Sequence, residues 1–123
     1  MNTETIELPG EVRWYLGALK AAGELEALRR VAKVPPEKWG HSHGVDWEGK
    51  RCLVGHAEDY RRYRDGGIRS EWDKRPIGSY PLDEERRGRV PHAFDAFARE
   101  HGAALAGHLC ATYARRLLEG PGK

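Results

Sequence analysis

Long apolar runs are missing from this chain of 123 residues, and cysteine, methionine and phenylalanine are scarce. No segment approaches the roughly 18 consecutive apolar residues that a membrane-spanning helix needs. The N-terminal sequence has neither the basic start nor the apolar core of a secretory signal. We therefore expect a cytoplasmic protein without a membrane segment. In that compartment the two cysteines, Cys52 and Cys110, are expected to be reduced, buried thiols.

The chain also has little net charge. Lys and Arg number 21 against 19 Asp and Glu, which gives a formal net charge of +2, so charge alone indicates no class of partner. The length suits one domain with one hydrophobic core and excludes a catalytic domain joined to a separate regulatory domain. With 39% hydrophobic and 33% charged residues, we expect a thin core, part of whose apolar surface is buried against a partner.

Apolar residues recur at helical spacing along much of the chain, which predicts a single helical domain over residues 1–123. Helices are expected from about Pro9 to Ala22, from Leu25 to Pro35, from Leu53 to Gly66, from Pro91 to Gly102, and from there to Gly120. The inward face of the last one is expected to carry Leu105, Leu109, Thr112, Tyr113, Leu117 and Leu118. The predicted fold class is all-α or mainly α: a compact bundle of about four or five helices, with a Gly-rich turn or small hairpin near 39–54 and a long irregular connection near 66–90.

Soft metal ligands are concentrated between residues 41 and 56. On a helix Cys52 and His56 share a face, and His41 and His43 on an extended segment point to one side, so the four side chains could converge on zinc. Structural zinc sites, however, use cysteine pairs about two to four residues apart, and this chain has no such pair. The alternatives are a zinc-dependent enzyme or zinc-stabilised fold at these residues, or buried and capping histidines with no cofactor.

No other catalytic signature is present. Cys52 near a helix start could be an activated thiol, but no Gly-rich nucleophile elbow accompanies it. The neighbouring carboxylates Glu58 and Asp59 would diverge on a helix. We therefore predict no catalytic residues and favour a protein that is not an enzyme.

Arginine and aromatic residues alternate from Tyr60 to Arg75, with acidic residues among them. Aromatic rings beside guanidinium groups can stack on bases and neutralise phosphates, and Trp and Arg are also common anchors of protein interfaces. The candidate binding residues are Trp39, Trp47, Tyr60, Arg61, Arg62, Tyr63, Arg64, Arg69, Trp72 and Arg75. Core filling is the alternative for each tryptophan, and a solvated helix end with local ion pairs is the alternative for the arginines.

These observations favour a small, non-catalytic intracellular binding protein that covers a site on a larger protein, as regulators and inhibitors do, phage-encoded ones among them. A nucleic-acid-binding regulator that uses the Arg61–Arg75 stretch is the first alternative, and the zinc protein is the second. A homodimer is compatible with the favoured function and with both alternatives. The run from Trp39 to Gly55 resembles short actinobacterial and phage proteins without a known activity, and this resemblance implies no function.

Overall fold

The computed structural model describes residues 6–40, 45, 46, 48–76 and 79–119. The α-helices are α1 (Gly10–Ala21), α2 (Leu25–Lys33), α3 (Leu53–Ala57), α4 (Glu84–Arg87), α5 (Val90–His101) and α6 (Ala103–Glu119). Two 3₁₀ helices, η2 (Pro36–Lys38) and η3 (Glu71–Lys74), and two short strands, β1 (Arg61–Arg62) and β2 (Ile68–Arg69), complete the described elements. The mainly α fold class is therefore confirmed. No helix in this part of the chain is both long and apolar enough to span a membrane.

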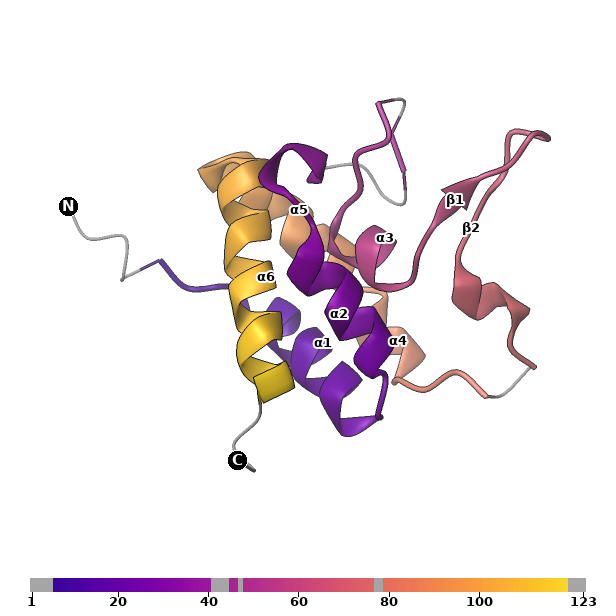
Figure 1. Ribbon diagram of the computed structural model, residues 1–123, viewed down its shortest axis with the longest axis horizontal. Helices are drawn as coiled ribbons and strands as arrows, with labels where there is room; N and C mark the ends of the chain where they lie inside the picture. Colours follow the sequence, from indigo (N-terminus) through magenta and orange to yellow (C-terminus); the bar gives the residue numbers. More distant parts are fainter. Residues whose placement is uncertain (1–5, 41–44, 47, 77–78, 120–123) are drawn as a thin grey trace.

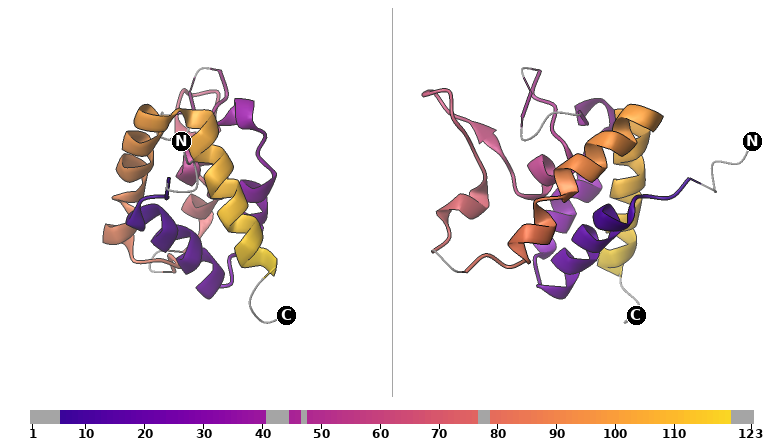
Figure 2. Two further views of the ribbon diagram at one scale, coloured as in Figure 1. Left: turned by 90° about the vertical axis from the view of Figure 1, so that its left-hand side faces the viewer. Right: turned by 180° about the vertical axis from the view of Figure 1, so that it is seen from behind.

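Four helices form the body of the molecule. α2 and α6 pack against each other, α5 lies behind them and α1 crosses below (Figure 1). The β1–β2 hairpin and η3 stand apart from this body, on the side away from the N-terminus, as the view from behind shows (Figure 2, right). A partner could therefore bind the hairpin without any rearrangement of the helical core.

The helices α1, α2 and α5 follow the predicted segments closely. α1 buries Val12, Leu16 and Leu19 on the face that the spacing predicts. α1 ends just before Gly23, whose φ of +76° is a conformation that glycine adopts without strain. In the same way α5 ends at Gly102, with φ of +94°. Local sequence signals therefore set these helix ends.

The inward face of α6 differs from the prediction. The buried residues of this helix are Ala106, Gly107, Cys110, Ala111 and Ala114, all small. The predicted large residues flank this stripe and are only partly buried. The reason is close packing: small side chains allow the backbones of α6 and α2 to approach, and the larger side chains then fill the edges of the contact.

The third predicted helix is wrong beyond Ala57. α3 stops there, and Asp59 adopts a left-handed conformation with φ of +56° that turns the chain out of the helix. Residues 60–69 then form the hairpin instead of two further helical turns. The 66–90 connection is also less irregular than predicted, because it contains β2, η3 and α4.

The Gly-rich segment before α3 forms a turn. Val45 and Arg51 make an antiparallel bridge, and Arg51 also bridges in parallel to Trp39. The Asp46 Oδ1 atom accepts a hydrogen bond of 2.8 Å from the Lys50 backbone N–H, which stabilises the turn. This turn holds the chain next to η2 and delivers it to the start of α3.

The side chain of Trp39 is buried in the core. Its ring is 4.7 Å from the ring of His56 and 5.7 Å from that of Phe94, measured between centroids, and only 2% of the residue is exposed. On the remaining side it lies against Gly107 of α6, where an added Cβ atom would overlap the indole ring. Gly107 is therefore required by the position of Trp39.

We expect Gly107→Ala to destabilise the protein by about 1–3 kcal/mol, because the indole cannot move within a packed core. Gly17→Ala is the matched control: Gly17 lies inside α1, and a methyl group added there would have nothing within 4 Å. That substitution should stabilise by about 0.5–1 kcal/mol through helix propensity. Urea unfolding of both variants checks this, and equal effects would contradict the account of Gly107.

A buried carboxylate joins the hairpin base to the helices. Glu58 follows α3 and is 1% exposed. It accepts hydrogen bonds from the hydroxyls of Tyr15 and Tyr80, at 2.9 and 3.0 Å, and from Nε and Nη2 of Arg87, at 3.0 and 2.7 Å. Burial, reinforced by the charge of Glu58, raises the pKa of both Tyr15 and Tyr80, so the hydroxyls keep the protons that they donate. The buried charge is thus fully paired.

We expect Glu58→Gln to destabilise the protein by about 3–5 kcal/mol, since it leaves the Arg87 guanidinium buried without its counter-charge. Glu26→Gln removes a carboxylate that pairs with exposed Arg29 and should cost less than about 1 kcal/mol. Chemical unfolding of the two variants measures the difference. A Glu58→Gln variant as stable as the Glu26→Gln control would show that the network contributes little.

Candidate functional site

The hairpin is built by pairing of Arg61 with Arg69 and of Arg62 with Ile68. Its end is tight: the Tyr63 N–H donates to the Gly67 carbonyl at 2.8 Å, and Gly66 takes a φ of +88° that a side chain would disfavour. Asp65 Oδ1 accepts from the Gly67 N–H at 2.8 Å and closes the turn. The hairpin is therefore a defined structure and not a loose loop.

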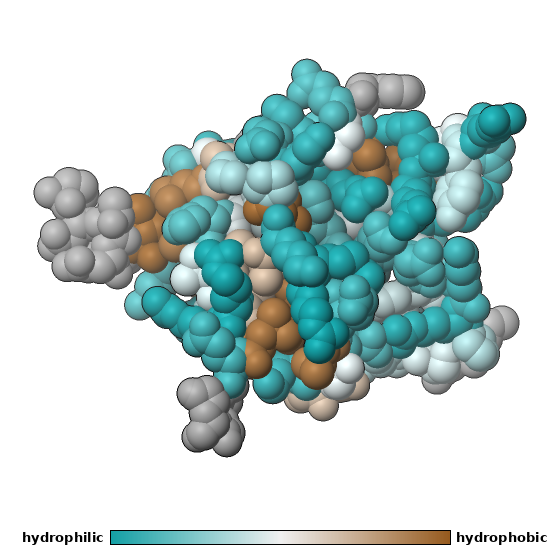
Figure 3. All heavy atoms as spheres, viewed as in Figure 1, coloured by the Kyte–Doolittle hydropathy of each residue, from teal (hydrophilic) through white to brown (hydrophobic). Residues whose placement is uncertain are grey.

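One face of the hairpin carries Arg61, Tyr63 and Arg69. Paired residues share a face and neighbouring pairs alternate, so these three side chains lie on one side and Ile68 on the other. The Arg69 guanidinium carbon lies 4.8 Å from the centre of the Tyr63 ring, a cation–π contact. Tyr63 and Ile68, each 37% exposed, are the exposed large hydrophobic residues of the described chain. On the hairpin side of the molecule the surface is mostly hydrophilic (Figure 3).

Carboxylates hold the arginines of this face in place. Arg61 Nη2 lies 2.8 Å from Asp59 Oδ2, and Arg69 Nη2 lies 2.7 Å from Asp65 Oδ2. Partial burial by itself raises the pKa of Asp59, but the hydrogen bond and charge of Arg61 outweigh it and lower that pKa. Hydrogen bonds from Arg69 and the Gly67 N–H lower the pKa of Asp65. Both carboxylates therefore stay ionised at neutral pH, and the local charge of the face is largely balanced.

Arg64 is different from its neighbours. Its side chain is exposed at the end of the hairpin. Among the described residues it makes no ion pair. It is thus the guanidinium of the hairpin that is most available to a partner.

Several predicted binding residues have structural roles instead. Trp39 and Trp72 are 2% and 5% exposed and belong to the core, which corrects their assignment to a surface. Arg75 pairs with Glu24 at 2.8 Å and covers the Trp72 ring. These residues fill space between segments, as a tryptophan does most often.

Two further predicted residues are engaged within the molecule. Half-buried Tyr60 accepts a hydrogen bond of 2.7 Å from Arg87 Nη2. Arg62 Nη2 donates to the Val45 carbonyl at 2.8 Å and ties the hairpin to the turn before α3. Trp47 lies outside the described residues. The exposed candidates are therefore Arg61, Tyr63, Arg64 and Arg69.

Sequence reasoning missed the hairpin itself, together with Ile68 and the two pairing aspartates. A signal was present: Asp-Gly is a strong short-range indicator of a β-hairpin turn, and Asp65-Gly66 lies at the tip. The apparent helical spacing through Tyr60 and Arg64 obscured it.

The structure describes two of the four predicted metal ligands, Cys52 and His56. His41 and His43 lie outside the described residues. Cys52 is buried at the N-cap of α3, where its Sγ accepts from the Gly55 N–H at 3.4 Å. His56 Nε2 lies 3.0 Å from the Lys38 carbonyl and must donate to it. Among the described residues no group of three or more His, Cys, Asp or Glu side chains is placed to hold a metal ion.

The sequence matches no known protein-family model, and neither a curated protein nor a solved structure is significantly similar to it. The resemblance of residues 39–55 to short actinobacterial and phage proteins gains no support from these comparisons. Function must therefore be argued from the geometry.

His56 makes stability depend on pH. Burial, with a contribution from the charge of Arg51, lowers the pKa of His56 to about 4 from an unfolded value near 6.5. The unfolded state therefore binds a proton between these pH values while the folded state does not. We expect the contribution of His56 to the free energy of unfolding to fall by roughly 3 kcal/mol as the pH decreases from above 6.5 to 4.

Unfolding free energies of wild type and His56→Gln across this pH range measure the effect, since the other titrating groups cancel in the difference. The difference should shrink as the pH falls. Gly17→Ala, which changes no titratable group, is the control and should differ from wild type by a constant amount. A constant difference for His56→Gln as well would refute the buried, neutral histidine.

Proposed function

We propose that the chain is a non-catalytic binding protein whose hairpin contacts a larger protein partner. The observation that supports this most is the exposed Tyr63 ring, held against Arg69 at the outside of a projecting hairpin. Tyr and Arg are among the residues that contribute most to protein interfaces. A short, rigid hairpin can insert such a ring into a recess of the partner.

The ion pairs of the face favour a protein partner over a phosphate backbone. Because Asp59 and Asp65 already balance Arg61 and Arg69, the face offers little net charge for phosphate-driven binding. The same pairs restrict the guanidinium groups before binding, which reduces the entropy lost in a complex. The partner that suits this face has an apolar recess with carbonyl or carboxylate acceptors at its rim.

Regulation or inhibition would follow from the position of the hairpin. A chain of this size that covers a recess on a larger protein blocks whatever else binds there, and it needs no chemistry of its own. We propose a cytoplasmic setting, in which the buried thiols Cys52 and Cys110 stay reduced. Burial raises the pKa of Cys110, which keeps this thiol protonated and unreactive.

Nucleic-acid binding is a second candidate, favoured by one observation. Arg64 is exposed without an ion pair in the described chain, next to an exposed aromatic ring, and such a combination suits a single strand whose bases stack. The two candidates differ in their response to salt. Phosphate contacts weaken steeply as salt is raised, whereas an apolar protein contact does not.

Affinity purification of the tagged chain from cells of its source organism tests the first candidate. The variant is Tyr63→Ala with Arg64→Ala, and we expect it to lose a protein that wild type retains at both low and moderate salt. With the purified partner, calorimetry should show binding weakened about tenfold or more.

The matched control is His108→Ala with Arg116→Ala, which also removes one exposed ring and one exposed arginine, from α6. It should retain the partner as wild type does. Equal retention by the hairpin variant would exclude the hairpin as the binding element. A partner that is released by nuclease, or whose binding decreases steeply with salt, would favour the nucleic-acid candidate instead.

A further inference from the structure

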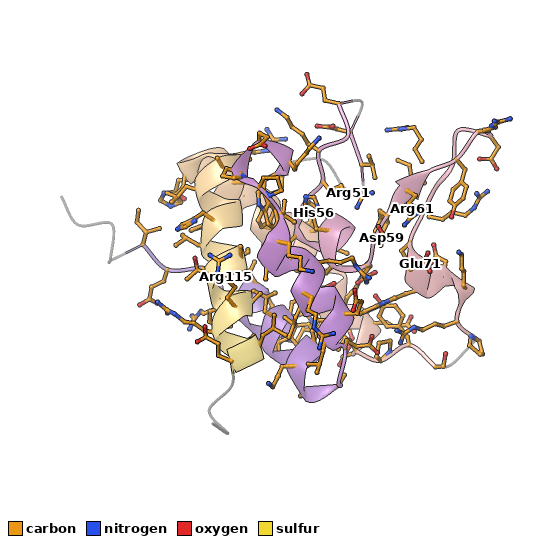
Figure 4. All side chains as sticks on the ribbon, in the orientation of Figure 1. Arg51, His56, Asp59, Arg61, Glu71 and Arg115 are labelled. Atoms are coloured by element: carbon orange, nitrogen blue, oxygen red, sulfur yellow. The ribbon has the colours of Figure 1, made fainter. Side chains whose placement is uncertain are left out.

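A basic pocket lies between the C-terminal end of α2, η2 and the turn before α3. It has a volume of about 370 Å³, and its lining includes Arg30, Lys33, Lys38, Arg51 and His56. The other described residues that line it are apolar or glycine, and none of the described lining residues is acidic. Four cationic side chains from three separate segments therefore meet at one depression, with Arg51 and His56 beside each other on the hairpin side of α2 (Figure 4).

The two arginines of the pocket are held in position. Arg30 donates from Nε and Nη2 to the Ala57 carbonyl, at 3.2 and 2.8 Å. Arg51 Nη1 lies 3.3 Å from Asp59 Oδ1, and only 25% of the Arg51 side chain is exposed. Neither bond uses all the N–H donors of its guanidinium. Both groups can therefore bind a ligand without being ordered first.

The two lysines are exposed and can move onto a ligand. Lys33 ends α2 and Lys38 ends η2. Among the described residues neither has a carboxylate partner, in contrast to most exposed cations of this chain. Their charges are thus uncompensated, and with those of the arginines they exceed the single negative charge of nearby Asp59.

The walls of the pocket are fixed to one another. The Lys38 carbonyl accepts from the Arg51 backbone N–H at 3.1 Å and from His56 Nε2 at 3.0 Å. His56 is neutral near pH 7, since its pKa is about 4, and it adds no repulsion among the cations. The pocket is therefore preformed, and the charged groups do not need a folding step to converge.

We propose that this pocket binds a phosphate group, either inorganic phosphate or the terminal phosphate of a small molecule, with Arg30 and Arg51 as fixed donors and Lys33 and Lys38 closing over it. Guanidinium groups match phosphate oxygens in geometry, and charge-assisted hydrogen bonds are the strongest available here. The volume lies at the lower end of the range for small-ligand sites, which suits such a ligand. The inference does not rest on the protein-binding role of the hairpin.

Titration of the whole chain with inorganic phosphate, pyrophosphate and adenosine 5′-monophosphate tests it, by calorimetry and by NMR of the backbone amides. We expect saturable binding of one equivalent, with shifts at the amides of Lys38 and Arg51. Equal affinity for phosphate and the monophosphate would mean that the phosphate alone is recognised. Tighter binding of the monophosphate would identify a phosphorylated small molecule as the ligand class.

The variant Lys33→Gln with Lys38→Gln should bind about tenfold or more weakly, because two charges leave the pocket. Lys74→Gln with Arg99→Gln removes the same charge from exposed positions elsewhere and should bind as wild type does. The proposal is overturned if no phosphate compound binds saturably, or if both double variants lose the same affinity. Neither result would affect the hairpin test, in which Lys33 and Lys38 are unchanged.

Discussion

The carboxylate of Glu58 is almost completely buried, and it survives there because four hydrogen bonds reach it from Tyr15, Tyr80 and Arg87. Losing Arg87 would leave the buried charge unpaired, and losing either tyrosine would remove a hydrogen bond from it, so the segments that supply these partners are fixed relative to one another. The backbone of Glu58 also makes a contact that fixes another segment. Its carbonyl accepts from the Glu71 N–H at 2.9 Å, at the start of η3. Both ends of the segment 59–70 are thereby attached at one residue, and what lies between them must leave the body as a hairpin.

This anchoring explains how a two-residue ladder can present a surface. An isolated hairpin with such short strands would be marginal in water. Here the base is held by the Glu58 network, one side by the bond from Arg62 to the Val45 carbonyl, and the tip by the turn at Gly66. The hairpin can then expose the ring of Tyr63 to solvent although the hairpin has no hydrophobic core of its own. The stability of the hairpin therefore depends on the helical body, while its chemistry faces away from it.

Sequence periodicity predicted α1, α2 and α5 well because their ends are set by local signals, such as Gly23 and Gly102. It failed where the local structure depends on a contact with residues that are distant in the sequence. Glutamate is rarely buried, so nothing in the local sequence indicates that Glu58 ends α3. Periodicity assigned the inward face of α6 to its larger residues, yet a helix that passes close to α2 and to Trp39 needs a glycine at position 107. In the site, composition identified the exposed arginines and Tyr63, but exposure itself depends on tertiary packing.

The two proposed surfaces meet at Asp59. Its carboxylate lies 3.3 Å from Arg51, which lines the pocket, and 2.8 Å from Arg61, which belongs to the hairpin face (Figure 4). A phosphate bound at the remaining donors of Arg51 would weaken the attraction of Arg51 for Asp59, and the carboxylate charge would then act more strongly on Arg61. Phosphate in the pocket would therefore change the affinity of the hairpin face for its partner. By linkage, a partner that binds Arg61 would change the affinity of the pocket for phosphate by the same factor. Because one carboxylate serves both arginines, the two surfaces would not be energetically independent even though they bind different ligands.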